Sequence, residues 1–171
     1  MSAETERVLA YLDGVHVAYR LSEHAPTATM AACAGVDRAL HALTPKNIFL
    51  TTKNGKHFYL CLTRPEARFR TADISKQAGS SRLSFAPEDR LYELLKCRPG
   101  AASPLGLIFD ADHAVTLLID RALHDAPTLA FHPCDNTLTL AMSGADFFDV
   151  FLPSVGVAPL DVEIHDFIEN G

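Results

Sequence analysis

A lysine and an asparagine stand where an apolar segment of this chain begins. Lys46 and Asn47 precede Ile48-Phe49-Leu50-Thr51-Thr52, which has the composition of a strand. A lysine entering a packed sheet must keep its ammonium in a cleft or find an anionic partner, because an unpaired buried charge is strongly unfavourable. The alternative is that Lys46 extends its ammonium from the strand end into solvent. A cleft at this position would suit an anionic ligand.

Two loops downstream could supply further chemistry. The first is Arg98-Pro99-Gly100-Ala101-Ala102-Ser103-Pro104, whose small residues would let an anion or a developing oxyanion approach the backbone N–H groups. The same composition is also typical of a tight connection between a helix and a strand.

The second loop, Phe131-His132-Pro133-Cys134-Asp135-Asn136-Thr137, contains a histidine between two predicted strands. His132 could act as a general acid or base, orient a substrate, or be a turn residue that bonds to nearby backbone. A thiol-nucleophile role for Cys134 is disfavoured. Residues two apart in a turn do not usually face each other, and no acid is placed to orient the imidazole.

Several familiar enzyme classes lack their sequence motifs here. The chain has no Gly-x-Ser-x-Gly, P-loop, Gly-x-Gly-x-x-Gly or His-Glu-x-x-His pattern. Its cysteines, Cys33, Cys61, Cys97 and Cys134, are widely separated without a Cys-x-x-Cys pair, so neither a zinc site nor a redox dithiol is indicated.

The elements that must position these residues are mixed in type. Apolar spacing and capping residues predict helices over 4–12, 30–43, 71–78, 87–95 and 143–151. They predict strands over 15–21, 48–52, 57–62, 107–109, 115–120, 129–131 and 137–141, with an edge strand near 162–164. Asn54-Gly55 predicts a tight primed turn between the second and third strands. Hairpins without regular strand-helix alternation favour an α+β domain with a curled antiparallel or mixed sheet.

Composition limits the broad class of protein. The 171 residues are 48% hydrophobic, which predicts one domain over 1–171. The sequence contains no run of about 18 apolar residues, the length that would span a bilayer, and its acidic start is unlike a signal peptide. We therefore expect a cytoplasmic protein.

The charge is distributed unevenly along the chain. The net charge of −6 disfavours sequence-independent binding along DNA. Residues 46–98 carry eleven Lys and Arg against five Asp and Glu, a net of +6, whereas residues 101–171 carry one Arg against eleven acids, a net of −10. Such a chain could hold one end of a polyanion and repel the remainder, or both regions could simply be solvated faces.

Four ordered segments resemble the YbaK and ProX-type aminoacyl-tRNA deacylases, freestanding relatives of the editing domain of bacterial prolyl-tRNA synthetase. They are 46–50 with the Gly55 hairpin, 83–85, 99–106 and 131–137. The resemblance covers most of the chain. It is closest to the ProXp-ala branch, which hydrolyses alanine mistakenly attached to proline tRNA, although Cys134 stands where Asn is common in similar sequences.

The resemblance implies a barrel-like mixed sheet wrapped by helices, and ester hydrolysis without a metal, cofactor or covalent intermediate. It implies that Lys46 positions the terminal adenosine and that His132 orients the substrate, both as catalytic-site residues. Other residues implied in the substrate site are Asn47, Gly100, Ala101, Ser103, Asp135 and Asn136. The partner implied is the acceptor end of tRNA(Pro), with prolyl-tRNA synthetase or an elongation factor as further candidates, and neither a membrane nor DNA.

Choice of the amino acid would depend on excluding proline by its size. Met30, Ile48 and Phe131 are candidate walls of the acyl pocket, and plain core packing is the alternative for each. Removal of cysteine from Cys-tRNA(Pro) and noncatalytic binding of tRNA or an amino-acid-like ligand remain alternative functions.

Overall fold

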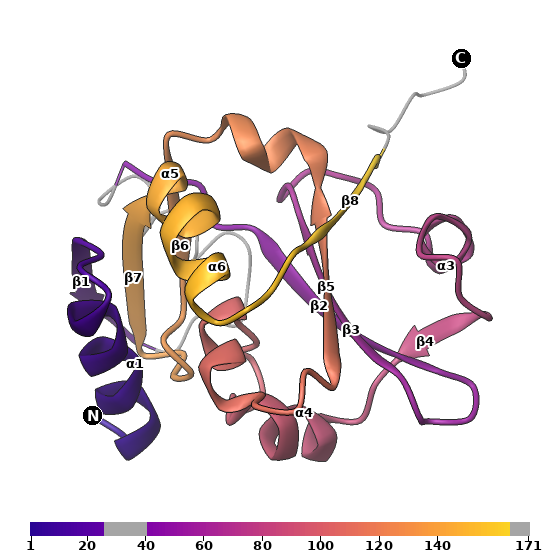
Figure 1. Cartoon of the computed structure of the whole chain (residues 1–171), viewed down its shortest axis with the longest axis horizontal. Coiled ribbons are helices and arrows are strands. Elements are labelled where there is room, and N and C mark those ends of the chain that lie inside the picture. Colours follow the sequence, from indigo (N-terminus) through magenta and orange to yellow (C-terminus); the bar gives the residue numbers. More distant parts are fainter. Residues whose placement is uncertain (26–40, 165–171) are drawn as a thin grey trace.

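The computed structural model describes residues 1–25 and 41–164, which form a mixed α+β fold, and it confirms the expected class (Figure 1). Its strands are β1 (Tyr19–Glu23), β2 (Lys46–Thr52), β3 (Phe58–Thr63), β4 (Leu83–Phe85), β5 (Val115–Asp120), β6 (Thr128–Phe131), β7 (Leu138–Ser143) and β8 (Leu160–Val162). Its helices are α1 (Ala3–Gly14), α3 (Thr71–Gln77), α4 (Glu88–Leu95), α5 (Gly144–Asp146) and α6 (Leu152–Ser154), with 3-10 helices η1 (Pro104–Phe109) and η2 (Arg121–Asp125) and the π-helical turn η3 (Phe147–Phe151).

The larger sheet has the strand order β4-β2-β3-β5-β8. β2 pairs antiparallel with β3 and β4, whereas β5 runs parallel to β3 and β8. The expected hairpin of β2 and β3 is therefore confirmed, and Lys46 lies opposite Thr63 at its open end.

The turn of this hairpin differs from the expected primed turn. Gly55 has a positive φ of 68°, but Asn54 does not. The Asn54 side-chain oxygen accepts hydrogen bonds from the Thr52 hydroxyl and the Lys56 N–H. These bonds stabilise Asn54 in ordinary turn geometry, so the glycine alone takes the left-handed conformation.

The smaller sheet has the order β1-β7-β6 and is antiparallel throughout. Among the described residues, an isolated parallel bridge from Leu43 to Leu129 joins it to the chain that leads into β2. Apolar side chains from both sheets share one core, including Leu60 of β3 and Leu140 of β7. Apart from this bridge, the described parts of the two sheets meet through side chains and neither sheet is closed, so the single barrel-like sheet expected from the family resemblance is not confirmed.

Side chains on the two faces of β2 enter different hydrophobic clusters. Phe49 belongs to the main core between the sheets, whereas Leu50 belongs to a second cluster that includes Ile74 of α3. Alternation along a strand gives this separation. It also assigns Lys46 to the α3 side of the sheet and Asn47 to the main-core side.

The strand expected over 15–21 begins later, at Tyr19. Helix α1 ends in a turn in which His16 has φ 61° and the Val17 N–H donates to Leu12 O. These contacts occupy the first residues of the expected strand. The expected helix over 30–43 lies mostly outside the described residues, and Leu43 at its end is in the β bridge.

The strand expected over 107–109 is part of the 3-10 helix η1. Ser103 caps this helix by accepting a hydrogen bond from the Leu105 N–H, and Pro104 occupies its first turn. A capping serine followed by proline favours a helical turn over an extended strand. The other expected helices and strands are present, with boundaries shifted by a few residues.

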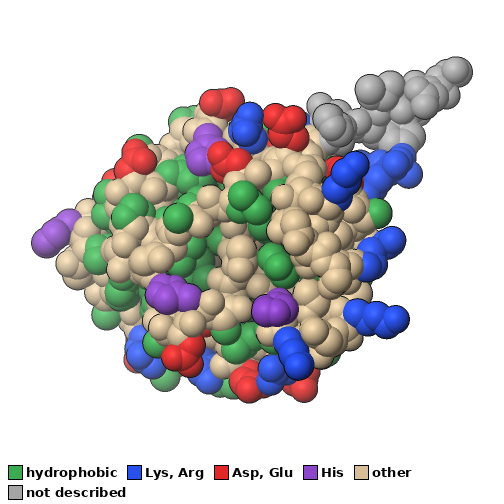
Figure 2. Space-filling model, turned by 45° about the vertical axis from the view of Figure 1, so that its right-hand side comes forward, with side chains coloured by type: hydrophobic (Ala, Val, Ile, Leu, Met, Phe, Trp, Pro, Cys, Tyr) green, Lys and Arg blue, Asp and Glu red, His purple; other side chains and the backbone are tan. Residues whose placement is uncertain are grey.

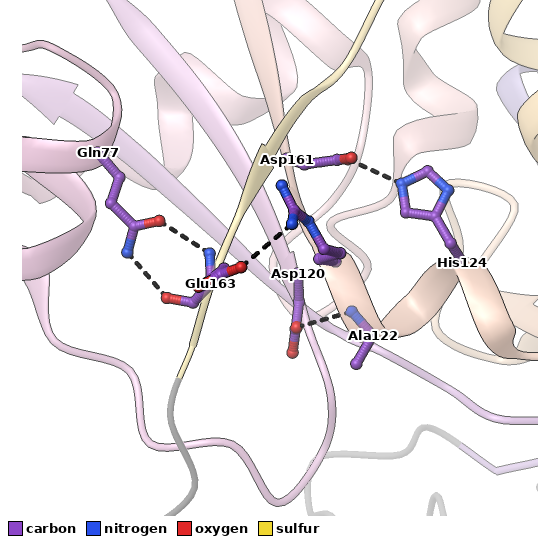
Figure 3. A network of polar contacts seen from close by, with 7 residues as sticks. Gln77, Asp120, Ala122, His124, Asp161 and Glu163 are labelled. Atoms are coloured by element: carbon purple, nitrogen blue, oxygen red, sulfur yellow. Dashed lines mark hydrogen bonds and ion pairs between the residues drawn. The ribbon is translucent and has the colours of Figure 1, made fainter.

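Polar contacts hold β8 and the adjoining Glu163 at the sheet edge (Figure 3). Gln77 of α3 exchanges two hydrogen bonds of 2.8 Å with the backbone of Glu163, and His124 contacts Asp161 at 2.7 Å. Segments far apart in the chain are therefore joined at this edge.

None of the described helices is long and apolar enough to cross a membrane.

Candidate functional site

Lys46 is a half-buried cation at the first position of β2. Across residues 1–25 and 41–164, its side chain forms no ion pair or hydrogen bond. Lys46 therefore has no anionic partner within the described residues, and its ammonium remains available to an anionic ligand.

Asn47 carries a buried acceptor without a partner. Its side-chain amide donates to Pro45 O at 3.1 Å, but its Oδ1 is the one described buried side-chain oxygen or nitrogen that lacks a hydrogen bond. Such a group is costly and calls for an explanation, because nearly all buried polar atoms are paired. A donor supplied by a ligand would satisfy it.

The loop 98–104 begins with a type II turn. The Ala101 N–H donates to Arg98 O at 2.9 Å, Pro99 occupies the second position, and Gly100 has φ 79°. Gly100 is exposed, whereas Ala101 is fully buried. The Ala101 N–H is thus committed to the turn, whereas Gly100 is exposed and has no side chain to block approach to its backbone.

Ser103, also proposed from the sequence, is fully buried and caps η1 through its hydroxyl. The structure therefore gives it a local role in the fold of the loop.

His132 follows β6, and its ring is fixed by backbone. Nδ1 lies 2.7 Å from Leu138 O, and because a carbonyl can only accept, Nδ1 must carry the proton. Burial lowers the pKa of His132 below 6.5, with a smaller contribution in the same direction from His24, although the bond to Leu138 acts in the opposite direction. The imidazole is therefore neutral at pH 7, with Nε2 in the form that accepts a hydrogen bond.

Asp135 and Asn136 shape the turn after His132. Asp135 Oδ1 accepts from the Thr137 hydroxyl at 2.6 Å and from its N–H at 2.8 Å, and these bonds lower the pKa of the carboxyl. A Cβ added at Gly100 would lie 3.4 Å from Asn136 Nδ2. The two candidate loops are therefore neighbours, as the family resemblance implies.

A pair of thiols lies where these loops meet. Cys97 Sγ and Cys134 Sγ are 3.5 Å apart, both are buried, and neither is in a disulfide. The contact with Cys97 and burial raise the pKa of Cys134, which keeps it a neutral thiol. This environment is unsuited to a nucleophilic thiolate.

The structure brings some of the candidate residues together and separates others. The Leu43–Leu129 bridge is parallel, so the segment from Leu43 to Lys46 runs in the same direction as the segment from Leu129 to His132. Lys46 and His132 therefore both lie toward the C-terminal end of β6. Ile48 and Phe131, by contrast, pack in different hydrophobic clusters. Met30 lies outside the described residues.

His24, which sequence reasoning did not identify, lies beside the candidate residue His132. Its Nε2 contacts the Thr139 hydroxyl at 2.7 Å, and its ring centroid lies 6.1 Å from that of His132. The pairing of β1 with β7 creates this contact between residues distant in sequence, so no local pattern could have revealed it. Within the two described ranges, no three His, Cys, Asp or Glu side chains converge on a candidate metal site.

The arrangement of sheets and helices is found in known structures. A crystal structure described as a candidate trans-editing enzyme for prolyl-tRNA synthetase matches with a TM-score of 0.71 at 16% identity, over 98% of this chain and 99% of the other. At that identity the similarity establishes the fold alone.

Sequence comparison defines the family. The model of the aminoacyl-tRNA editing domain matches residues 24–150, a range that contains Lys46, both loops and His24. The chain therefore belongs to the aminoacyl-tRNA editing domain family, which confirms the resemblance and the expected class of enzyme.

Two relatives illustrate the relationship. The prolyl-tRNA editing protein ProX of Acetoanaerobium sticklandii is 33% identical over 141 residues, which span 82% of this chain and 86% of that protein. Prolyl-tRNA synthetase associated domain-containing protein 1 of Mus musculus is 34% identical over 119 residues, spanning 67% and 69% of the two chains.

Proposed function

We propose that the protein is a trans-editing hydrolase that removes alanine from mischarged Ala-tRNA(Pro) in the cytoplasm, with the whole chain 1–171 as one editing domain. Family membership and the similarity to a protein named as a prolyl-tRNA editing protein support the proposal. The observation that carries it is the pair at the start of β2: a half-buried cation next to a buried acceptor, neither of which has a partner within the described residues.

The two ends of an aminoacyl ester match these two groups. Lys46 would bind a phosphate or ribose oxygen of the terminal nucleotide, because an ammonium is a strong donor to such oxygens. Asn47 Oδ1 would accept a hydrogen bond from the free α-ammonium of the amino acid. Since the two side chains lie on opposite sides of β2, the substrate would lie across the strand end.

The chemistry needs few further groups, because an aminoacyl ester is already activated. Water would attack the acyl carbon, and the bond to the ribose oxygen would break to release alanine and tRNA. The Gly100 backbone would stabilise the oxyanion, and neutral His132 would orient the substrate through Nε2. The ribose hydroxyl next to the ester could assist proton transfer to the leaving oxygen.

Single-turnover hydrolysis of Ala-tRNA(Pro) by Lys46→Ala and Lys46→Met tests the proposal. We expect the rate to fall at least about 100-fold in both, as for the loss of a group that stabilises charge at a reacting centre. Arg20→Ala, which removes an exposed cation of β1, is the matched control and should retain the wild-type rate. Unchanged hydrolysis in folded Lys46→Ala would refute the role of this residue.

A panel of charged tRNAs separates the alternatives. Faster hydrolysis of Cys-tRNA(Pro) than of Ala-tRNA(Pro) would replace alanine by cysteine as the preferred group. Tight binding of tRNA without hydrolysis of any ester would identify a noncatalytic binding module.

A further inference from the structure

Exposed cations lie on three adjoining elements of the larger sheet: the β2–β3 hairpin, α3 and the segment that enters β4. These cations are Lys53, Lys56, Arg70, Lys76 and Arg82. In the part of the chain that the structure describes, none of them forms an ion pair. Figure 2 shows Lys and Arg side chains spaced along the right-hand side of the molecule, the side on which Figure 1 places these elements.

The elements form one surface because α3 and β4 are bonded together. Ser75 of α3 accepts a hydrogen bond from the Leu83 N–H, and the Arg82 guanidinium donates to the Thr71 hydroxyl at 3.2 Å. β4 in turn pairs with β2. The segments that carry the five cations therefore form one surface. We call this surface the α3–β4 face.

An exposed aromatic side chain lies on the same face. Phe85 is 71% exposed at the end of edge strand β4, and its ring centroid is 6.4 Å from that of Phe69. A large apolar side chain left in water among cations suggests a binding surface. Aromatic rings beside arginines are the means by which proteins stack unpaired RNA bases and hold the adjoining phosphates.

The α3–β4 face is continuous with the candidate site. Phe85 lies directly opposite Leu50, so both side chains are on one side of the sheet, and alternation places Lys46 on that side too. Lys46 and Leu50 are separated by about 13 Å along the strand, at about 3.3 Å per residue. A nucleic acid whose end is at Lys46 could therefore extend over Phe85.

We propose that the α3–β4 face binds the acceptor arm of tRNA, with Phe85 stacking on a base and Arg70, Lys76 and Arg82 contacting phosphates. The inference rests on the proposed function for the identity of the polyanion. Charge selects this occupant, because the face is cationic whereas residues 101–171 carry a net charge of −10 and would repel RNA. A protein partner on this face is the competing outcome of the test.

Two substrates of different size test the proposal: full-length Ala-tRNA(Pro) and the 3′-alanyl ester of adenosine, which contains the reacting bond without the arm. For Arg70→Ala/Arg82→Ala and for Phe85→Ala, we expect kcat/KM on the tRNA to fall about five- to tenfold or more, with the nucleoside ester hydrolysed at the wild-type rate. Phe85→Tyr should restore most of the loss because it keeps the ring. Arg20→Ala is the control on the smaller sheet.

Binding of uncharged tRNA(Pro) by wild type and variants provides a readout independent of hydrolysis. The slope of log affinity against log salt should decrease in magnitude by about 0.7 to 0.9 for each phosphate contact removed. Unchanged tRNA affinity and salt slope in the variants would overturn the proposal and leave a protein partner as the explanation of Phe85. If wild type binds tRNA through this face but hydrolyses neither ester, the proposed function fails and the binding surface stands.

Discussion

At the scale of single residues, backbone partners decide what the candidate side chains can do. Leu138 O fixes the His132 tautomer, and burial lowers the pKa of its ring. Ser103 and Ala101 are held by local hydrogen bonds and burial, so Gly100 is the exposed one of these three candidate residues. The local hydrogen bonds and burial of each candidate residue therefore limit the role that it can have.

The state of His132 predicts a pH dependence. Because burial lowers the pKa of His132, Nε2 should become protonated at a lower pH than in an ordinary histidine, and its contribution to hydrolysis should be lost as the pH falls through the folded pKa. The ratio of wild-type to His132→Gln rates should therefore be constant above pH 6.5 and fall toward one at lower pH. Taking the ratio cancels the titration of the substrate. A ratio that begins to fall well above pH 6.5 would contradict a neutral, buried imidazole.

At the scale of elements, close backbone approach positions the two loops. A Cβ added at Gly106 of η1 would lie 2.4 Å from Leu95 O and 2.9 Å from Cys97 Sγ. The absence of a side chain thus lets η1 pack against the end of α4, where Cys97 meets Cys134. Loop 98–104 is held between these two elements.

Substituting this glycine should destabilise the protein. We expect Gly106→Ala to lower the free energy of unfolding by about 1 to 3 kcal/mol, because the methyl group must displace backbone. Gly14→Ala is the matched control, since nothing lies within 4 Å of its added Cβ and alanine is the better helix former. Urea unfolding of both variants measures the difference, and equal effects would show that η1 can move away from α4 at little cost.

At the scale of the molecule, a buried ion pair fastens the end of the described chain to the larger sheet. Arg64 Nε lies 2.8 Å from Asp120, which is 2% exposed, and Arg64 also donates to Ile164 O. The nearby pair of Arg121 and Glu163 is exposed. The two pairs should therefore differ greatly in their contribution to stability.

We expect Asp120→Asn to lower the free energy of unfolding by about 3 kcal/mol, because it removes the charge of a buried carboxylate that faces a mostly buried guanidinium. Glu163→Gln should cost less than about 0.5 kcal/mol, as is usual for an exposed pair. Thermal or urea unfolding at low and high salt measures both. An equal and salt-sensitive loss in the two variants would indicate that water screens the Arg64–Asp120 pair.

The sequence by itself determined the local features of the protein. It indicated the capped helix α1, the β2–β3 hairpin, the α+β class and the three polar segments, because caps, turn residues and side-chain periodicity act over a few neighbouring residues. It could not separate a strand from a 3-10 helix at 107–109, where a short apolar run fits both.

Only the tertiary structure decided how these segments meet. The β1–β7 pairing brings His24 to His132, and the main core joins two open sheets without closing a barrel. Alternation along β2 places Ile48 against the second cluster, whereas Phe131 of β6 packs in the main core. Each of these outcomes depends on contacts between residues distant in the chain. Their free energies depend on packing and burial in three dimensions, which residue order shows only indirectly.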